Sequence, residues 1–332
     1  MKKVLCLVPV DEAHRKKLEE AGRGCEFVYS SETEVTEGQV AAANAILGCP
    51  PPEMIKCSEK LELLQLNIAG ADRYIKPGIL AESTALTNST GAYSKAVAEH
   101  GAAMLFMLQK KLHLYRDAQK RREWTDYGTV SSIDECTVLI VGLGDIGCHF
   151  ARIIKALGGY VIGVKRRSST RPECVDELYT MEKLDELLPR ADVVFSVLPG
   201  TSATYHMYTS ERFDRMKKSA IFINCGRGAA VENSVLYDAV KSGKIAAAGV
   251  DVSEVEPLPE DSPLWSLDNL MITPHVSGYY HLPYTYERVV DIAADNLRRW
   301  THGEELINNV DRSTGYKKLE KAGFPHRKPA FL

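Results

Sequence analysis

The sequence lacks the features that mark membrane, nucleic-acid-binding and low-complexity proteins. No apolar run in its 332 residues approaches the ~18–20 residues that a membrane span requires. The 41 basic and 44 acidic residues leave a net charge of −3, so no overall charge favours nucleic acid or an anionic membrane. Internal repeats and low-complexity tracts are also missing. We therefore expect a globular protein whose partner is a small molecule.

Cysteine pairs of the CxxC type are absent as well. The eight cysteines are scattered, and several lie in apolar, strand-like runs. This spacing favours reduced thiols in a cytoplasmic protein over disulfides or a zinc site, and we expect no bound metal. The N-terminal run Val4–Val8 resembles the apolar part of a signal peptide, but the run stops at Asp11 and no small-residue cleavage site follows. We interpret it as a first strand.

Length and periodicity predict two α/β domains. A chain of 332 residues exceeds one ordinary core of ~100–150 residues, and two domains imply a cleft between them. Short apolar runs alternate with amphipathic stretches from end to end, which is typical of βαβ units on parallel sheets. The predicted fold class is α/β, with two Rossmann-like or flavodoxin-like domains that each contain a parallel sheet.

Ten apolar runs are predicted strands. They are Val4–Val8, Ala45–Leu47, Leu61–Leu66 and Ala85–Thr87, then Thr137–Val141, Tyr160–Val164, Val193–Val197, Ala220–Asn224, Ala246–Val250 and Leu270–Ile272. Helical spacing indicates helices at Glu12–Ala21, from about Ser94 to Glu123 with or without an interruption, and at Tyr286–Trp300. We expect a dinucleotide-binding domain at 98–284, inserted between segments 1–97 and 285–332 of a discontinuous substrate-binding domain.

A glycine-rich turn follows the first predicted strand of the second part. Gly142 permits the tight turn, Gly144 lets the backbone approach a pyrophosphate, and Gly147 lets the next helix lie close to the strand. The free N–H groups at the start of that helix face the phosphates. The motif therefore predicts a dinucleotide cofactor, with contacts at Gly142, Gly144, Asp145, Ile146 and Gly147.

Basic and hydroxyl residues follow the next predicted strand. An acidic residue at the tip of this strand would accept hydrogen bonds from the adenosine ribose of NAD, but Lys165, Arg166, Arg167 and Ser168 stand there instead. Guanidinium groups and hydroxyls attract a 2′-phosphate, whereas a carboxylate repels one. The sequence thus favours NADP(H), with NAD(H) as the alternative. A basic surface turn without a ligand is a further interpretation, which the position at the tip of the strand disfavours.

Three candidate catalytic residues follow the last three predicted strands. Arg227, Glu256 and His275 lie in loops that face the ligand crevice of an open parallel sheet. Together they suit the reduction of a 2-keto acid, because Arg227 can pair with the carboxylate or polarise the carbonyl and His275 can donate the proton. Glu256 would orient the imidazole and favour its protonated form. Each of the three has a structural alternative. Arg227 could form a surface ion pair, Glu256 could be a turn residue, and His275 could be a structural histidine.

Taken together, the motifs resemble those of the D-isomer-specific 2-hydroxyacid dehydrogenases over most of the chain. The segments that carry the resemblance are Asn67-Ile-Ala-Gly-Ala-Asp72, Ala96-Val-Ala-Glu-His100, Val141-Gly-Leu-Gly-Asp-Ile-Gly147, Asn224-Cys-Gly-Arg-Gly228, Gly249-Val-Asp-Val252, Glu256-Pro257 and Pro274-His275. The resemblance implies that Arg227, Glu256 and His275 form the catalytic trio.

The same resemblance implies further contacts. Substrate would bind to Arg227, to His275 and to backbone groups of the loop Ala69, Gly70 and Ala71, where small residues let an anion approach closely. The family also implies a homodimer built by the long helix of the cofactor domain. The remaining cofactor contacts that it implies are Leu198, Pro199, Thr204, Cys225, Gly226, Asp251, Ser277 and Gly278.

The predicted function is NADPH-preferring reduction of a small 2-keto acid, such as glyoxylate, hydroxypyruvate or an aryl pyruvate, to the D-hydroxy acid. A dinucleotide-sensing binding protein, similar to the C-terminal-binding-protein corepressors, is the alternative, which retention of the trio disfavours. The segment Val276-Ser-Gly-Tyr-Tyr280 departs from the Gly/Ser-Ala run more frequent in the family. Pocket shape depends on Tyr74, Tyr93, Tyr279 and Tyr280 among others. These aromatic rings could stack on an aryl substrate or pack at a dimer contact, and the sequence favours neither.

Overall fold

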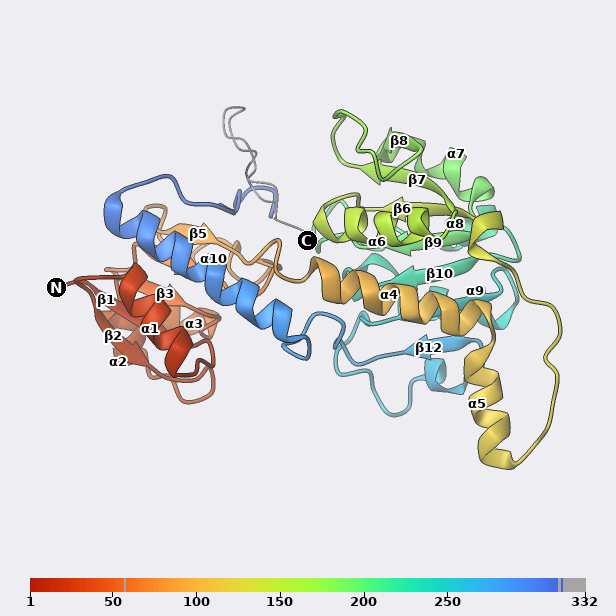
Figure 1. Cartoon of the computed structure of the whole chain (residues 1–332), viewed down its shortest axis with the longest axis horizontal. Coiled ribbons are helices and arrows are strands. Elements are labelled where there is room, and N and C mark those ends of the chain that lie inside the picture. Colours follow the sequence, from red (N-terminus) through yellow and green to blue (C-terminus); the bar gives the residue numbers. More distant parts are fainter. Residues whose placement is uncertain (57, 316–317, 319–332) are drawn as a thin grey trace. The chain divides into compact units, whose positions relative to one another are not determined.

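A computed structural model describes residues 1–56, 58–315 and 318 of the chain (Figure 1). Its contacts divide the chain into two compact units, one made of Met1–Ser89 with Ile292–Leu332 and the other of Thr90–Asp291. Each unit contains one sheet, and every ladder between the named strands is parallel. The predicted α/β class with two parallel sheets is therefore confirmed.

The first unit contains a five-stranded sheet in the order β2-β1-β3-β4-β5, which is the order of flavodoxin-like doubly wound sheets. Its strands are β1 (Lys3–Cys6), β2 (Glu26–Tyr29), β3 (Ala45–Leu47), β4 (Leu63–Gln65) and β5 (Ala85–Thr87). Its helices are α1 (Glu12–Ala21), α2 (Glu37–Ala42), α3 (Pro52–Ile55) and the C-terminal part of α10 (Pro283–His302). Apolar side chains of the central strands, such as Leu5, Ile46 and Leu64, are buried in one cluster.

Local chemistry fixes both ends of α1. The Asp11 carboxylate accepts a hydrogen bond from the His14 amide at 2.9 Å, which satisfies one of the free donors of the first turn. Gly22 follows the last turn, and a Cβ on this residue would lie 2.7 Å from the ring of Phe27. The helix therefore begins and ends at the predicted residues.

The second unit contains a seven-stranded sheet in the order β12-β11-β10-β9-β6-β7-β8. Read from β8, this is the order 3-2-1-4-5-6 of dinucleotide-binding domains with one additional strand. The strands are β6 (Thr137–Val141), β7 (Tyr160–Lys165), β8 (Glu177–Thr180), β9 (Val193–Ser196), β10 (Ile221–Asn224), β11 (Ala247–Val250) and β12 (Leu270–Ile272). The helices are α4 (Ser94–Gln109), α5 (Leu112–Arg121), α6 (Asp145–Ala156), α7 (Leu184–Leu187), α8 (Ser210–Arg215) and α9 (Asn233–Lys241), with 3-10 turns at Ile133–Glu135, Met181–Lys183, Leu188–Arg190, Gly228–Ala230 and Pro263–Ser266.

Both faces of this sheet are covered. Along β6, Leu139 and Val141 belong to one buried cluster, whereas Val138 and Ile140 belong to another, as expected for a strand whose side chains alternate between two faces. Helices α4 and α6 pack against each other on the side of the second cluster, and Figure 1 shows them on one face of the sheet. A sheet covered in this way leaves the loops at its strand ends as the accessible positions for a site.

The long helical pattern after residue 93 forms two helices. Helix α4 ends at Gln109 and α5 begins at Leu112, and between them Lys111 takes the left-handed backbone conformation with φ 56°. This conformation breaks the helical hydrogen-bond pattern, so the chain changes direction at the end of α4. Within the described residues, no helix is long and apolar enough to cross a membrane.

Candidate active site

The glycine-rich turn between β6 and α6 forms a cradle made of backbone alone. Gly142 has φ +105°, and a Cβ on it would lie 2.7 Å from the Val197 carbonyl oxygen. A Cβ on Gly147 would lie 2.5 Å from the Gly142 oxygen, whereas a Cβ on Gly144 would meet nothing within 4 Å. The first and third glycines are thus required by packing, and the second, at the N-terminus of α6, leaves open space.

That open space suits the pyrophosphate of a dinucleotide. It lies at the carboxyl end of β6, between β7 and β9, where the strand order reverses and where ligands of doubly wound sheets bind. The first residues of α6, Asp145 and Ile146, present helix N-terminal amides toward an anion. The turn at Gly142–Gly147 therefore fits the pyrophosphate of a dinucleotide at this position.

The basic turn after β7 lies beside this cradle, because β7 pairs with β6. Lys165 ends the strand, and its Nζ donates a hydrogen bond to Ser169 Oγ at 3.0 Å. Arg166, Arg167 and Ser168 are exposed. The turn itself carries no carboxylate, so it presents cations and hydroxyls to a ligand at the strand tip.

On the other side of β6, the loop after β9 and the loop after β10 are in backbone contact with each other. The Cys225 amide donates to the Ser196 carbonyl at 3.0 Å, and a Cβ on Gly226 would lie 2.6 Å from the backbone nitrogen and oxygen of Leu198. Thr204 Oγ1 donates to the Pro199 carbonyl at 2.6 Å, which closes the loop after β9. Burial raises the pKa of the Cys225 thiol, which disfavours its thiolate form.

Arg227 lies between two glycines that have no room for side chains. Gly226 contacts the loop after β9, as described above, and a Cβ on Gly228 would lie only 1.9 Å from the Ser253 carbonyl oxygen. The backbone on either side of Arg227 is thereby pressed against two neighbouring loops. Asn224 holds this turn, because its Nδ2 donates to the Arg227 carbonyl at 3.0 Å and its Oδ1 accepts from the Gly226 amide at 3.1 Å.

His275 and Glu256 form a hydrogen-bonded pair. The distance from His275 Nδ1 to Glu256 Oε2 is 2.8 Å, and the two side chains are 48% and 40% exposed. Because an ionised carboxylate can only accept, Nδ1 carries the hydrogen and Nε2 is left to exchange a proton with a ligand. The Ser253 amide donates to the other oxygen, Glu256 Oε1, at 3.0 Å. The carboxylate is therefore fixed at both oxygens while the imidazole stays accessible.

Asp251 organises the loop that carries His275. Its side chain is buried, and it accepts hydrogen bonds from Thr273 Oγ1 at 2.6 Å and from the amides of Val276 and Ser277 at 3.0 Å each. The His275 amide donates to the Asp251 carbonyl at 2.7 Å. These bonds hold His275 at φ 54°, a left-handed conformation that costs roughly 1–2 kcal/mol for a residue with a Cβ.

The role of Asp251 in this loop was not evident in the sequence, which places the residue only among the cofactor contacts. His100 on α4 extends the network, since its Nε2 lies 3.0 Å from Thr273 Oγ1 and 3.7 Å from Asp251 Oδ1. Gly278, also an expected cofactor contact, lies against the start of α4, where a Cβ would be 3.2 Å from the ring of Tyr93, the residue before the helix, and 3.4 Å from Val97. A charged residue directly after a buried strand was the only sequence signal for this arrangement.

The loop expected to bind the substrate carboxylate belongs to the first unit. Asn88 Nδ2 donates to the Ala69 carbonyl at 2.7 Å, and the Tyr74 amide donates to the Ala71 carbonyl at 2.9 Å. The carbonyls of Ala69 and Ala71 thus accept hydrogen bonds from residues of the same unit. In the part of the chain that the structure describes, the amides of Ala69, Gly70 and Ala71 have no acceptor. Ala69 and Gly70 are partly exposed, which leaves their amides available to an anion, whereas Ala71 is buried.

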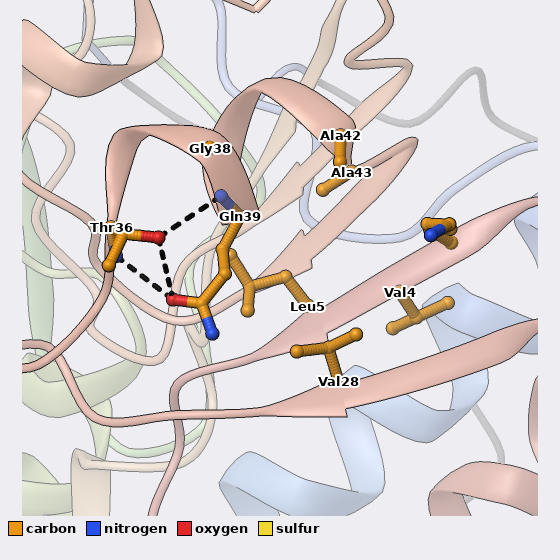
Figure 2. Close-up of a pocket in the computed structure, with 9 residues that line it drawn as sticks. Val4, Leu5, Val28, Thr36, Gly38, Gln39, Ala42 and Ala43 are labelled. Carbon is orange, nitrogen blue, oxygen red and sulfur yellow. Dashed lines mark hydrogen bonds between the residues drawn. The ribbon is translucent and has the colours of Figure 1, made fainter.

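The first unit also contains a small apolar cavity of about 290 Å³, which Figure 2 shows between β1, β2 and α2. Thr36 and Gln39 at its rim bond to each other in a capping box, with the Gln39 amide 3.3 Å from Thr36 Oγ1 and the Thr36 amide 2.9 Å from Gln39 Oε1. None of the predicted site residues lines the cavity, and its polar groups are already paired. It is not the candidate active site.

Two further observations limit the chemistry of the described chain. No group of three or more His, Cys, Asp or Glu side chains is arranged to hold a metal ion among residues 1–56, 58–315 and 318. The seven cysteines in this range are free thiols, and Cys57 lies outside the described residues. An imidazole–carboxylate pair at the carboxyl edge of a dinucleotide-binding sheet suits the proton transfer of a nicotinamide-dependent dehydrogenase.

Comparison with known proteins specifies the family. Residues 102–277 match the family model for the NAD-binding domain of D-isomer specific 2-hydroxyacid dehydrogenases. A glyoxylate/hydroxypyruvate reductase B of Citrobacter koseri is 32% identical over 282 residues, which cover 82% of this chain and 85% of that protein. The chain belongs to the D-isomer specific 2-hydroxyacid dehydrogenases, and it is an NAD(P)-dependent oxidoreductase.

Solved structures agree with this assignment. A D-isomer specific 2-hydroxyacid dehydrogenase family protein from Aeromonas salmonicida is 32% identical with a TM-score of 0.83, and the match covers 94% of this chain and 99% of that one. A family member from Xanthobacter autotrophicus, solved in complex with NADPH and MES, is 28% identical with a TM-score of 0.82 and coverage of 95% and 99%. The predicted family is thus confirmed, and the cofactor is a nicotinamide dinucleotide.

Proposed function

We propose that this protein reduces a small 2-keto acid to the D-2-hydroxy acid, with NADPH as the preferred cofactor. The observation that carries the proposal is the His275–Glu256 pair at 2.8 Å, with the imidazole Nε2 accessible, in the unit that holds the glycine cradle. When bound, the nicotinamide supplies the hydride. His275 Nε2 gives a proton to the carbonyl oxygen, and Glu256 stabilises the imidazolium that precedes this transfer.

Two groups are assigned to the substrate carboxylate. Arg227 offers a guanidinium from a turn that Gly226 and Gly228 fix against neighbouring loops. The loop Ala69–Ala71 of the other unit offers the amides of Ala69 and Gly70, which are partly exposed. We assign dinucleotide binding to the unit Thr90–Asp291 and carboxylate binding to the loop in the first unit, with 2-keto acids of the glyoxylate and hydroxypyruvate type as first candidates because the Citrobacter koseri relative bears that name.

The direct test is an absorbance assay of NADPH oxidation with a panel of glyoxylate, hydroxypyruvate, and alkyl and aryl pyruvates, followed by chiral analysis of the product. We expect turnover and a D-product with at least one member. The absence of turnover on every member, in a protein that binds NADPH, would instead support a dinucleotide-sensing role. His275→Ala should lower kcat by about two to four orders of magnitude, as loss of a general acid does. A near-normal rate in this variant would assign the proton to another group.

NADPH preference is proposed from the basic turn after β7, and the Xanthobacter autotrophicus relative was solved with NADPH. Replacement of both Arg166 and Arg167 by Ala should raise the Kd of NADPH by about one to two orders of magnitude, since each guanidinium–phosphate hydrogen bond is worth roughly 1.5–3 kcal/mol before screening. The Kd of NADH should change little. An equal loss for both dinucleotides would show that the arginines do not bind the 2′-phosphate.

We also propose a homodimer formed through α5 and the segment that follows it. Several large apolar side chains there are exposed, with exposed fractions of 50% for Leu112, 37% for Tyr115 and 43% for Val130, and Trp124 fully exposed. Large exposed apolar side chains concentrated in one segment of the chain favour an association surface. Sedimentation equilibrium should give a dimer, and Leu112→Asp with Trp124→Ala should give a monomer.

A further inference from the structure

A second histidine–glutamate pair lies two residues from Glu256. His206 Nε2 is 2.6 Å from Glu254 Oε1, and because the carboxylate can only accept, Nε2 carries the hydrogen. The two side chains are 31% and 23% exposed, so this pair is more enclosed than His275 and Glu256. We propose that the His206–Glu254 pair is a positioning clamp that keeps Glu256, and through it His275, in the orientation required for proton transfer. This inference rests on the proposed function.

Glu254 fixes its own loop to the start of α9. Its second oxygen, Oε2, accepts a hydrogen bond from the Asn233 amide at 3.1 Å, a first-turn donor that has no acceptor inside the helix. In return, Asn233 Oδ1 accepts from Ser253 Oγ at 3.2 Å and from the Glu254 amide at 3.4 Å. The peptide segment 253–254 is therefore bound to the helix from both directions.

The same segment supplies the hydrogen bond that orients Glu256. The Ser253 amide donates to Glu256 Oε1 at 3.0 Å, while His275 Nδ1 donates to Oε2 at 2.8 Å. A shift of Ser253 would rotate the carboxylate and carry the imidazole with it. Glu254 is thus connected to the proton donor through one peptide group and one carboxylate, with no contact of its own to His275.

His206 is itself held in place. Its amide donates to the Ala229 carbonyl at 2.8 Å, its ring stacks on Tyr205 with centroids 3.8 Å apart, and its backbone has φ 46°. Ala229 lies two residues after Arg227, and Thr204 lies two residues before His206. The clamp therefore connects the loop after β9, the loop that carries Arg227 and the loop that carries Glu256.

Steady-state kinetics of the full chain, with NADPH and the best keto acid of the panel, test the clamp. Glu254→Ala and His206→Ala should each lower kcat by about 10–100-fold, the effect of a misplacement of about 1 Å, with the KM values changed less than about threefold. His206→Gln keeps an N–H donor and should recover kcat to within about threefold. The matched control is Glu186→Gln, which removes an exposed ion pair with Lys183 at 2.8 Å and should leave kcat unchanged.

A double-mutant cycle separates positioning from general destabilisation. If Glu254 acts through Glu256, Glu254→Ala should lower kcat much less in a Glu256→Gln background than in the wild type. Full additivity, unchanged kcat in both single variants, or a loss confined to KM would overturn the clamp while leaving the reductase function standing.

NMR of the imidazole nitrogens gives a readout that needs no turnover. In its neutral form, the imidazole of His275 in the wild type should carry its hydrogen on Nδ1, and Glu254→Ala should give a mixture of the two tautomers. An unchanged tautomer in Glu254→Ala would contradict the clamp. Inactivity of the wild-type protein itself on the panel would instead contradict the proposed function.

Discussion

Gly228→Ala is the substitution whose effect the structure specifies most directly. A Cβ at this position would lie 1.9 Å from the Ser253 oxygen, 2.0 Å from the Ser253 carbonyl carbon and 2.5 Å from the Glu254 nitrogen, all of them backbone atoms. Contacts under 3.0 Å are essentially never seen for a real Cβ, so the two loops must separate by about 1.1 Å, which is 3.0 minus 1.9. No flexible side chain can absorb this movement.

The separation would act on activity and on stability. Arg227 precedes the substituted residue and Glu256 follows the displaced segment, so kcat should fall by about 10²-fold, as expected for a 1 Å error in catalytic geometry. Overpacking lowers the free energy of unfolding by about 1–3 kcal/mol. Each kcal/mol lost lowers Tm by about 2–4 °C. Kinetics with the best keto acid and differential scanning calorimetry measure the two effects.

Gly38→Ala is the matched control. Gly38 lies in α2, and a Cβ there would meet nothing within 4 Å. The substitution should leave kcat unchanged and should stabilise the helix by about 0.5–1 kcal/mol, because alanine loses less conformational entropy than glycine. A Gly228→Ala protein with the Tm and kcat of the wild type would refute the argument from close backbone contact.

Three other predictions follow from single contacts. Asp251→Asn places an amide donor against backbone N–H groups, and it should lower the free energy of unfolding by about 1–3 kcal/mol and reduce kcat by loosening the His275 loop. Arg190 lowers the pKa of Glu177 from 4.5 to about 2. The stabilisation of the folded protein by this pair is therefore complete above about pH 4.5 and is lost as the pH falls toward 2. The difference in Tm between the wild type and Glu177→Gln should narrow over that pH interval. Thr36→Ala removes the capping box of α2 and should cost about 1 kcal/mol in urea unfolding.

The buried strands could be predicted from the sequence because their environment is uniform. All residues of β9, β10 and β11 are buried, so each reads as a continuous apolar run. The two strands that the sequence analysis missed, β2 and β8, consist of half-buried residues. Both lie at a sheet edge, where one side of the strand has no neighbour and polar residues are tolerated. The predicted strands β5 and β12 lie at sheet edges too, but each retains at least one fully buried residue. The missing signal in β2 and β8 is therefore a consequence of edge position combined with the absence of any fully buried residue.

The candidate site likewise contains residues that the sequence predicts and contacts that it does not. GxGxxG turns and the residues after the late strands are local patterns, and the structure places Glu256 and His275 in contact, while their catalytic roles stay predictions. Contacts such as His206–Glu254 join residues 48 positions apart and depend on how loops pack. No spacing rule in the sequence indicates them. The interruption at Lys111 was located only by the structure, because lysine has no special preference for a left-handed backbone.

The strand order of the seven-stranded sheet separates the basic turn at Arg166 and Arg167 from the imidazole of His275. The basic turn follows β7 and the imidazole loop follows β12, five strand positions away along the order β12-β11-β10-β9-β6-β7. At about 4.8 Å for each step this is about 24 Å, roughly three Debye lengths at physiological ionic strength. Charge changes at Arg166 and Arg167 are consequently screened from His275. Dinucleotide preference and proton donation should evolve, or be engineered, as independent properties of two distant parts of one sheet.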